Sequence, residues 1–426
     1  MTTSTFKPGD TISTVRTVAV IGLGYIGLPT AAILAANGLS VVGVDLNSNV
    51  VDAVNAGKVP FVEPDLGIHV AGAVSQGSLI AQTTTPAADA YIVAVPTPFA
   101  EDKSADLRFV RAAAQSIAPM LSGGELIILE STSPPGTTAM LADFVLELRP
   151  DLSLDGSAGR PAVLFAHCPE RVLPGRIMIE LVTNDRIVGG LTDEAASAAA
   201  ALYSVFCQGN IHLSNAATAE MAKLVENAYR DVNIAFANEL SVISHNLGIN
   251  VWDLIELANH HPRVDILKPG PGVGGHCIAV DPWFIVAADR ENSRLIRTAR
   301  EVNDAKPDHV ISQVMSAVSG MLAPTIAALG LAFKANIDDT RESPALDIVR
   351  RLAESTPEAR IYVSAPHADR LPSELSSFSN VILADAEAAV EAADVIVLLV
   401  DHDKFRDLDP MSLTGKKVVD TRGFWR

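Results

Sequence analysis

Residues Gly22-Leu23-Gly24-Tyr25-Ile26-Gly27 form a glycine-rich loop between two apolar stretches of the chain. Residues 15–21 are rich in β-branched side chains, which favours a strand, and residues 29–37 have the composition of a helix. A second apolar run, residues 40–44, follows and ends at Asp45. This order predicts two parallel strands joined by a crossover helix.

The glycines at positions 22, 24 and 27 predict a dinucleotide site. Glycine lets the backbone approach a pyrophosphate at a helix N-terminus, where aligned N–H groups favour anions. Asp45 stands where an acidic residue hydrogen-bonds the adenosine ribose and repels a 2′-phosphate, so we expect NAD rather than NADP. The loop alone leaves open a flavin cofactor or a purely structural glycine turn.

Alternating strands and helices continue on both sides of a long helix. Strands are predicted at residues 91–95, 126–130 and 163–166, and an alanine-rich helix at 193–206. Residues 218–247 predict one amphipathic helix, because apolar side chains recur there at helical spacing. After Pro307, strands are predicted at 325–331, 360–363, 381–383, 395–400 and 417–420, with a helix beginning at Ser343-Pro344.

The predicted fold class is therefore α/β: two Rossmann-like doubly wound domains joined by a central helical region with one long helix. We expect a flexible tail at residues 1–14, an NAD-binding domain at 15–205, a central region at 206–305 and a C-terminal domain at 306–426. The central region would carry the dimer contact. The second sheet lacks a glycine fingerprint, so we expect it to bind a nucleotide differently.

Composition limits the function classes. The chain has 426 residues, 48% of them hydrophobic, and a formal net charge of −18, so nucleic acid is an unfavourable partner. Residues 18–44 are apolar but interrupted by glycines, which argues against a membrane span. The three cysteines, Cys168, Cys207 and Cys277, do not form a disulfide framework, so we expect a reducing cytoplasm. We also expect no metal site.

Two segments carry reactive groups. Residues 269–277 form a glycine- and proline-rich loop that ends at Cys277, where a thiolate would be a nucleophile. Lys223 and Asn227 are four apart on the long helix, so they share a face and together could stabilise an oxyanion. The alternatives are a buried, inert cysteine, which we expect for Cys168 and Cys207, and a solvated lysine.

With these segments in order, the chain resembles the UDP-glucose/GDP-mannose dehydrogenase family from about residue 15 to its end. The resemblance is carried by the 22–27 loop, residues 130–132 and 168–170, the Lys223–Asn227 pair, residues 274–277, Asp281, and the cation-bearing segment 333–344. Segments 168–175, 230–240, 276–284 and 423–426 are most similar to family members that act on UDP-N-acetyl-D-mannosamine.

The resemblance implies a four-electron, NAD-dependent oxidation of the sugar C6 alcohol to a carboxylate, for a bacterial surface polysaccharide. It makes Cys277 the nucleophile that forms a thiohemiacetal and then a thioester, and Lys223 and Asn227 the oxyanion-stabilising pair. Glu170 would assist proton transfer and position water, and Asp281 would order that water. Implied cofactor contacts are Tyr25, Ile26, Thr97, Thr132 and Arg341; implied substrate contacts are Arg171, Arg263, Gly274, Gly275, His276, Phe333, Lys334 and Arg422.

Several points stay open at this level. UDP-glucose dehydrogenases carry a second Glu where this chain has Pro174, which supports a different sugar pocket and leaves Glu170 as the only acid there. The alternatives are a UDP-N-acetyl-D-glucosamine 6-dehydrogenase, a two-electron hydroxy-acid dehydrogenase centred on Lys223 and Asn227, and a non-catalytic NAD-binding scaffold. We expect a homodimer or higher homo-oligomer, in which Arg263 reaches the substrate of a neighbouring subunit.

Overall fold

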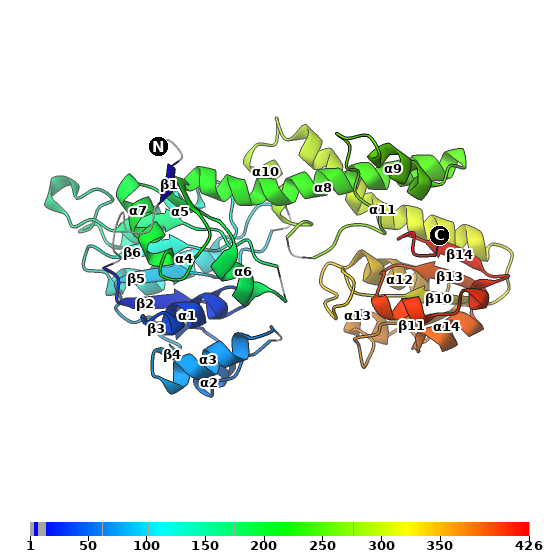
Figure 1. Ribbon diagram of the computed structural model, residues 1–426, viewed down its shortest axis with the longest axis horizontal. Coiled ribbons are helices and arrows are strands. Elements are labelled where there is room, and N and C mark those ends of the chain that lie inside the picture. Colours follow the sequence, from blue (N-terminus) through cyan, green and yellow to red (C-terminus); the bar gives the residue numbers. More distant parts are fainter. Residues whose placement is uncertain are drawn as a thin grey trace. The chain divides into compact units, whose positions relative to one another are not determined.

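The computed structural model describes residues 4–6, 14–61, 63–100, 102–173, 175–275 and 277–425. The chain divides into two compact units, Met1–Val225 and Glu226–Arg426. Each unit contains one β-sheet with helices on both of its faces (Figure 1). This arrangement confirms the predicted α/β class.

Within the described residues, the first unit holds a nine-stranded sheet in the order β1-β9-β8-β7-β6-β5-β2-β3-β4. Strands β4, β3, β2, β5, β6 and β7 are parallel and follow the doubly wound Rossmann order. The order reverses between β2 and β5, where such sheets bind ligands at the carboxyl ends of their strands. The strands are β1 Ser4–Phe6, β2 Thr17–Ile21, β3 Ser40–Val44, β4 Leu79–Gln82, β5 Ala90–Val93, β6 Leu126–Leu129, β7 Leu164–His167, β8 Arg186–Gly190 and β9 Ile211–Asn215.

Helices cover both faces of this sheet, and strand side chains alternate between them. Val18 and Val20 pack with helices on one face, whereas Ala19 and Ile21 pack with helices on the other. The first face is covered by α1 Gly27–Ala36, α2 Ser48–Asn55, α3 Leu66–Ser75, α6 Ile177–Thr183 and α7 Asp193–Tyr203. The second is covered by α4 Arg108–Ile117 and α5 Thr137–Leu148.

Two sequence predictions differ from the structure in this unit. Ser4–Phe6, expected in a flexible tail, is a strand that pairs antiparallel with β9, because Phe6 is buried in the core; that part of the tail prediction was wrong. The rest of the tail, apart from residue 14, lies outside the described residues. Strand β9 follows the predicted domain end at residue 205 yet belongs to the first sheet, because it pairs with β8.

The helical part of the chain contains one 32-residue helix, α8 Ala216–Leu247, as the sequence predicts. It is followed by α9 Val251–Asn259, α10 Asp281–Ala288 and α11 Arg294–Val318. Helix α11 continues through Pro307, so the predicted boundary at residues 305/306 falls inside a helix. Apolar residues of its last turns pack against the second sheet, which stabilises the helix beyond the proline.

The second sheet is parallel throughout its described strands, in the order β12-β11-β10-β13-β14. Its strands are β10 Thr325–Leu329, β11 Arg360–Ser364, β12 Val381–Leu383, β13 Val395–Leu398 and β14 Lys417–Asp420. Helices α11 and α12 Pro344–Ser355 cover one face, and α14 Ala386–Ala392 covers the other. Ser343 caps α12 by accepting a hydrogen bond from Leu346 N, as the Ser-Pro pair predicts.

Candidate active site

The glycine loop follows β2 and leads into α1, and its three glycines have different roles. Gly22 has a φ of +96°, and a Cβ there would lie 2.5 Å from the Ala94 carbonyl oxygen. A Cβ on Gly27 would overlap the carbonyl of Gly22. Gly24 has no protein atom within 4 Å of its Cβ position, so this backbone is open to a ligand. The loop thus fits a pyrophosphate at the start of α1.

Asp45 stands at the carboxyl end of β3, as predicted, with its carboxylate held by two backbone donors. Leu23 N donates to Oδ2 at 3.0 Å and Asn47 N donates to Oδ1 at 2.9 Å. Asp45 is therefore fixed beside the glycine loop, where a ribose hydroxyl would find an acceptor. Tyr25 stacks on Phe61, with ring centroids 4.2 Å apart.

Thr97 and Thr132 follow β5 and β6, at the same edge of the sheet. The Thr97 hydroxyl donates to the Thr132 carbonyl oxygen at 2.5 Å, which joins the two loops. These threonines and the open Gly24 backbone make the carboxyl edge of the first sheet a suitable place for NAD.

Lys223 lies on α8 in the first unit and is half-buried. Three residues earlier, the buried Glu220 accepts hydrogen bonds from Gly136 N at 2.6 Å and Thr138 N at 2.7 Å. These bonds fix the first turns of α8 to the start of α5, beside the loop that carries Thr132. The backbone that carries Lys223 is therefore rigidly placed.

Cys277 and its neighbours form the second group, in the second unit. The Asn227 side chain donates to Asp281 at 2.6 Å, and both side chains are buried. Asp281 N donates to the Cys277 carbonyl oxygen at 2.8 Å, which closes the turn between the cysteine and α10. Cys277 is exposed, whereas Cys168 and Cys207 are buried as expected. Burial raises the pKa of Cys168 to about 12, so that thiol is not a nucleophile.

A buried ion pair holds the turn after Cys277. Arg300 on α11 pairs with Asp231 on α8 at 2.6 Å and approaches the Ile278 carbonyl oxygen at 3.5 Å. Both charged side chains are almost fully buried. This pair was not predicted from the sequence, because a helical residue pattern does not show that an arginine will be buried.

The predicted substrate loop packs against the loop that follows β10. Cβ positions on Gly274 and Gly275 would lie 2.9 and 3.0 Å from Phe333 side-chain atoms, so only glycine fits against this ring. Lys334 is exposed beside it. His276 lies outside the described residues.

Two predicted cations have acidic partners. Arg341 pairs with Asp339 at 2.5 Å, and Arg422 pairs with Asp401 at 2.8 Å. Both of these arginines are thus ion-paired with an acidic side chain. Arg422 also lies against Gly270 at the start of the substrate loop. Arg263 is exposed.

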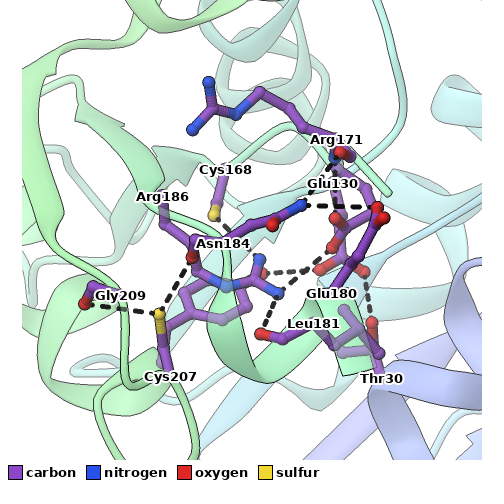
Figure 2. Close-up of polar contacts among 12 residues, drawn as sticks. Thr30, Glu130, Cys168, Arg171, Glu180, Leu181, Asn184, Arg186, Cys207 and Gly209 are labelled. Atoms are coloured by element: carbon purple, nitrogen blue, oxygen red, sulfur yellow. Dashed lines mark hydrogen bonds and ion pairs between the residues drawn. The ribbon is translucent and has the colours of Figure 1, made fainter. Parts of the chain in front are cut away.

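Glu170 follows β7 in the first unit, and its ion-pair partner Arg186 lies in a buried polar cluster (Figure 2). Its carboxylate pairs with Arg186 at 3.2 Å and accepts a hydrogen bond from Arg171 N at 2.6 Å. The Arg171 side chain instead donates to the Asp185 carbonyl oxygen. Arg186 was not predicted, because an arginine usually lies at the surface and this one is buried at the start of β8.

The site residues therefore occupy both units. The first unit contains the glycine loop, Asp45, Thr97, Thr132, Glu170, Arg171 and Lys223. The second unit contains Asn227, Arg263, Gly274, Gly275, Cys277, Asp281, Phe333, Lys334, Arg341 and Arg422.

Three family models match the chain in succession. They describe the NAD binding domain, the central domain and the UDP binding domain of one family, and match residues 16–207, 217–305 and 327–426. The chain belongs to the UDP-glucose/GDP-mannose dehydrogenase family. It is an NAD-dependent UDP-sugar dehydrogenase.

Full-length relatives of this dehydrogenase have two different names. An NDP-N-acetyl-D-galactosaminuronic acid dehydrogenase of Ralstonia nicotianae is 55% identical over 411 residues, which are 96% of each chain. A UDP-N-acetyl-D-mannosamine dehydrogenase of Salmonella typhi is 54% identical over 419 residues, 96% of this chain and 99% of the relative. The solved UDP-D-ManNAc dehydrogenase of Pyrococcus horikoshii is 38% identical, with a TM-score of 0.84 and 96% of each chain covered.

Two features are absent from the described residues. No helix there combines the length and the apolar character that crossing a membrane requires. No group of three or more His, Cys, Asp or Glu side chains is arranged there to hold a metal ion.

Proposed function

We propose that this dehydrogenase oxidises the C6 alcohol of UDP-N-acetyl-D-mannosamine to the carboxylate, giving UDP-N-acetyl-D-mannosaminuronate. The observation that carries the chemistry is the arrangement of Cys277, Asp281 and Asn227, in which an exposed thiol is joined by one turn to a buried Asp–Asn pair. The substrate is supported by relatives named for UDP-N-acetyl-D-mannosamine that match almost the full chain.

The oxidation proceeds in two stages, for each of which bound NAD⁺ supplies the hydride acceptor. In the first stage the C6 alcohol loses a hydride and a proton to become an aldehyde. The Cys277 sulfur then adds to the carbonyl carbon and forms a thiohemiacetal, which loses a second hydride and a proton to become a thioester. Water hydrolyses the thioester, which releases the carboxylate and returns the thiol.

The remaining residues act on protons and charge. Lys223 and Asn227, four apart on α8, stabilise the oxyanion at C6 by charge and hydrogen bonding. Asp281 orients the Asn227 amide through their hydrogen bond and helps to order the hydrolytic water. Glu170 receives the proton of the alcohol and positions that water. Lys334, Phe333 and the glycine loop at 274–275 hold the nucleotide sugar.

A second sugar has a specific observation in its favour. The Ralstonia relative named for N-acetyl-D-galactosaminuronic acid is as similar to this chain as the Salmonella relative named for the mannosamine sugar. UDP-N-acetyl-D-galactosamine is therefore the second candidate substrate. Both sugars carry an acetamido group at C2, so either assignment differs from UDP-glucose.

We also propose a homodimer formed through α8. Five large apolar side chains of this helix are exposed and recur at helical spacing: Val225 at 45%, Tyr229 at 69%, Phe236 at 54%, Ile243 at 45% and Leu247 at 67%. An apolar stripe of this kind is typical of a helix that packs on a partner. We expect a second copy of the chain to cover this stripe, as the long helix in the sequence predicts.

Two further inferences concern the cell. We place the enzyme in the cytoplasm, because a catalytic thiol needs a reducing compartment. We assign the uronate product to bacterial surface polysaccharide synthesis, as the family resemblance implies.

The test is a comparison of kcat/KM for UDP-N-acetyl-D-mannosamine, UDP-N-acetyl-D-galactosamine, UDP-N-acetyl-D-glucosamine and UDP-glucose with NAD⁺. The proposal predicts the highest value for the mannosamine sugar. A higher value for the galactosamine sugar supports the second candidate, and a preference for the glucosamine sugar or UDP-glucose contradicts both.

A further inference from the structure

The carboxylate of Glu170 pairs with Arg186, which lies in a buried cluster of polar groups (Figure 2). The Arg186 guanidinium is 3.2 Å from Glu170 Oε2, 3.6 Å from the Cys168 sulfur and 3.4 Å from the Leu181 carbonyl oxygen. It also lies over the aromatic rings of Tyr203 and Phe206, at 4.7 and 5.1 Å from their centroids. Its side chain is only 5% exposed. Arg186 is thus held by polar contacts and by two aromatic rings, and its position fixes that of Glu170.

A second carboxyl group belongs to the same cluster. Glu130 is 1% exposed and accepts hydrogen bonds from the Tyr203 hydroxyl at 3.0 Å and the Thr30 hydroxyl at 3.1 Å. Hydroxyl groups can donate or accept, so these partners suit a protonated carboxyl as well as an ionised one. Within the described part of the chain, the carboxylate that contacts the Arg186 guanidinium is that of Glu170 and not that of Glu130.

The charges in the cluster do not balance unless one carboxyl is neutral. Arginine is always protonated in proteins, so Arg186 supplies one positive charge. Burial raises the pKa of the Cys168 thiol to about 12 and holds the pKa of Tyr203 well above its usual range, so both are neutral. Burial first, and then the charge of Glu170, raise the pKa of Glu130 to about 8. Two ionised carboxylates beside one buried cation would leave an uncompensated buried charge.

We infer that Glu130 is a protonated, neutral acid in the working enzyme and that Arg186 is a positioning residue whose charge is committed to Glu170. Neutral Glu130 leaves the cation to Glu170, whose buried carboxylate is thereby held in place as the base. This inference rests on the proposed role of Glu170. It adds two residues, Glu130 and Arg186, that are almost completely buried and act only through that base.

The state of Glu130 is measured without turnover. Infrared spectra of the wild type and of Glu130→Gln near neutral pH are subtracted, and the carbonyl stretch of a protonated carboxylic acid is sought in the difference. We expect this band in the wild type, its absence in Glu130→Gln, and its loss from the wild type as the pH rises above about 8. A difference spectrum without that band near neutral pH overturns the inference.

The role of Arg186 is measured by kinetics on the full-length enzyme. Arg186→Met removes the charge, and we expect kcat to fall by about 100-fold, within the range that general acid–base catalysis contributes. We also expect the acidic limb of its pH–rate profile to move up by about 1 to 3 pH units, the effect of losing an adjacent opposite charge. Arg186→Lys keeps the charge and should restore most of the profile.

The matched control is Arg149→Met, also in the first unit. Arg149 pairs with Asp151 at 2.6 Å and donates to the carbonyls of Ala118 and Leu121, so it too is an ion-paired arginine bonded to backbone. We expect its pH–rate profile to match the wild type. If the acidic limb of the Arg186→Met pH–rate profile is unshifted, the arginine is merely structural and its positioning role is overturned.

The outcomes separate this inference from the proposed function. If the wild type oxidises none of the four UDP-sugars, the proposed function fails, whereas the infrared band of Glu130 still reports its protonation state. If the wild type turns over but the band is missing, only the inference fails. If Arg186→Met does not fold, two measurements still test the inference: the infrared difference spectrum of the wild type and Glu130→Gln, and the pH–rate profile of Arg186→Lys. A Glu130 band, together with an unshifted acidic limb in the Arg186→Lys profile, supports the inference.

Discussion

Asn227 donates a hydrogen bond from its side-chain amide to the carboxylate of Asp281, with 2.6 Å between Nδ2 and Oδ2 and both side chains buried. The bond joins the long helix α8 to the first residue of α10, four residues after Cys277. It therefore fixes the Asn227 amide relative to the backbone that carries the thiol.

This relationship predicts the effect of Asn227→Asp. The change replaces a donor by a carboxylate opposite a carboxylate, so the two side chains repel each other and the oxyanion loses a hydrogen-bond donor. We expect kcat to fall by about 100-fold, as for removal of one oxyanion donor. The free energy of unfolding should fall by about 1–3 kcal/mol, as for a broken buried hydrogen bond.

The control is Asn233→Asp on the same helix. Asn233 donates to the Tyr229 carbonyl oxygen at 2.7 Å in an exposed position, so the substitution changes charge without placing two buried carboxylates together. Steady-state kinetics and thermal unfolding of both variants check the prediction. Equal activity of the two variants would contradict it.

The open backbone at Gly24 predicts a loss of cofactor binding without a loss of stability. An added Cβ there meets no protein atom within 4 Å, so Gly24→Ala should fold normally and obstruct only the pyrophosphate. We expect the Kd for NAD to rise at least about tenfold, equivalent to about 1.4 kcal/mol of binding free energy.

Gly67→Ala is the matched variant, because Gly67 in α3 is also open around its Cβ position. Its NAD affinity should equal that of the wild type, as measured by calorimetric titration. An unchanged affinity in Gly24→Ala would remove the glycine loop from the proposed pyrophosphate site.

The proposed role of Cys277 predicts at which step the reaction stops when this nucleophile is removed. Cys277→Ala should abolish formation of the sugar acid, because no thioester is formed, whereas NAD binding should survive. Product analysis by mass spectrometry and NAD titration measure the two effects. Cys207→Ser is the control, since Cys207 is a buried thiol that contacts the carbonyls of Asn184 and Gly209. Acid formation by Cys277→Ala at the wild-type rate would exclude the thioester route.

The fold was largely predictable from the sequence, because its determinants are local. The glycine loop, β2 and β3 lie where the residue pattern places them, and Ser343-Pro344 marks the start of α12. Strand β1 was not predictable, because three residues of low apolar content become a strand only by pairing with β9, which is distant in sequence.

The candidate site was predictable only in its motif residues. Cys277, Asn227 and Asp281 belong to sequence patterns, and two of them are joined by a hydrogen bond in the structure. Arg186 at the start of β8 and Glu130 directly after β6 support Glu170, and a charged residue gives no local sign that it will be buried. Such contacts depend on tertiary packing, which a residue pattern does not encode.

The raised pKa of Glu130 predicts how stability varies with pH. Between the unperturbed value of 4.5 and about 8, the folded protein keeps this proton and the unfolded chain has lost it. The folded state then binds more protons, so this group lowers stability as pH rises through that window, by at most about 1.4 kcal/mol per pH unit.

Glu130→Gln removes this titration, so its stability relative to the wild type should increase with pH across the same window. Urea unfolding at several pH values between 5 and 8 gives the difference in free energy of unfolding. A difference that is constant with pH, or that decreases as pH rises, would contradict the assigned protonation state.

The exposed apolar stripe on α8 predicts the oligomeric state. Phe236 is 54% exposed on this helix, so Phe236→Glu should place a charge in the proposed dimer contact and yield a monomer. Glu239→Lys, a charge change on an exposed polar residue of the same helix, should leave the dimer intact. Sedimentation equilibrium measures both, and a wild type that is monomeric would contradict the proposed dimer.

The central claim is that one enzyme carries the sugar alcohol through to the acid on Cys277. The most direct measurement is the yield of NADH from a limiting amount of UDP-N-acetyl-D-mannosamine, followed by absorbance with excess NAD⁺. Oxidation to the carboxylate through a cysteine thioester predicts about two NADH per sugar. A yield of about one NADH, with an aldehyde as the product, would contradict it.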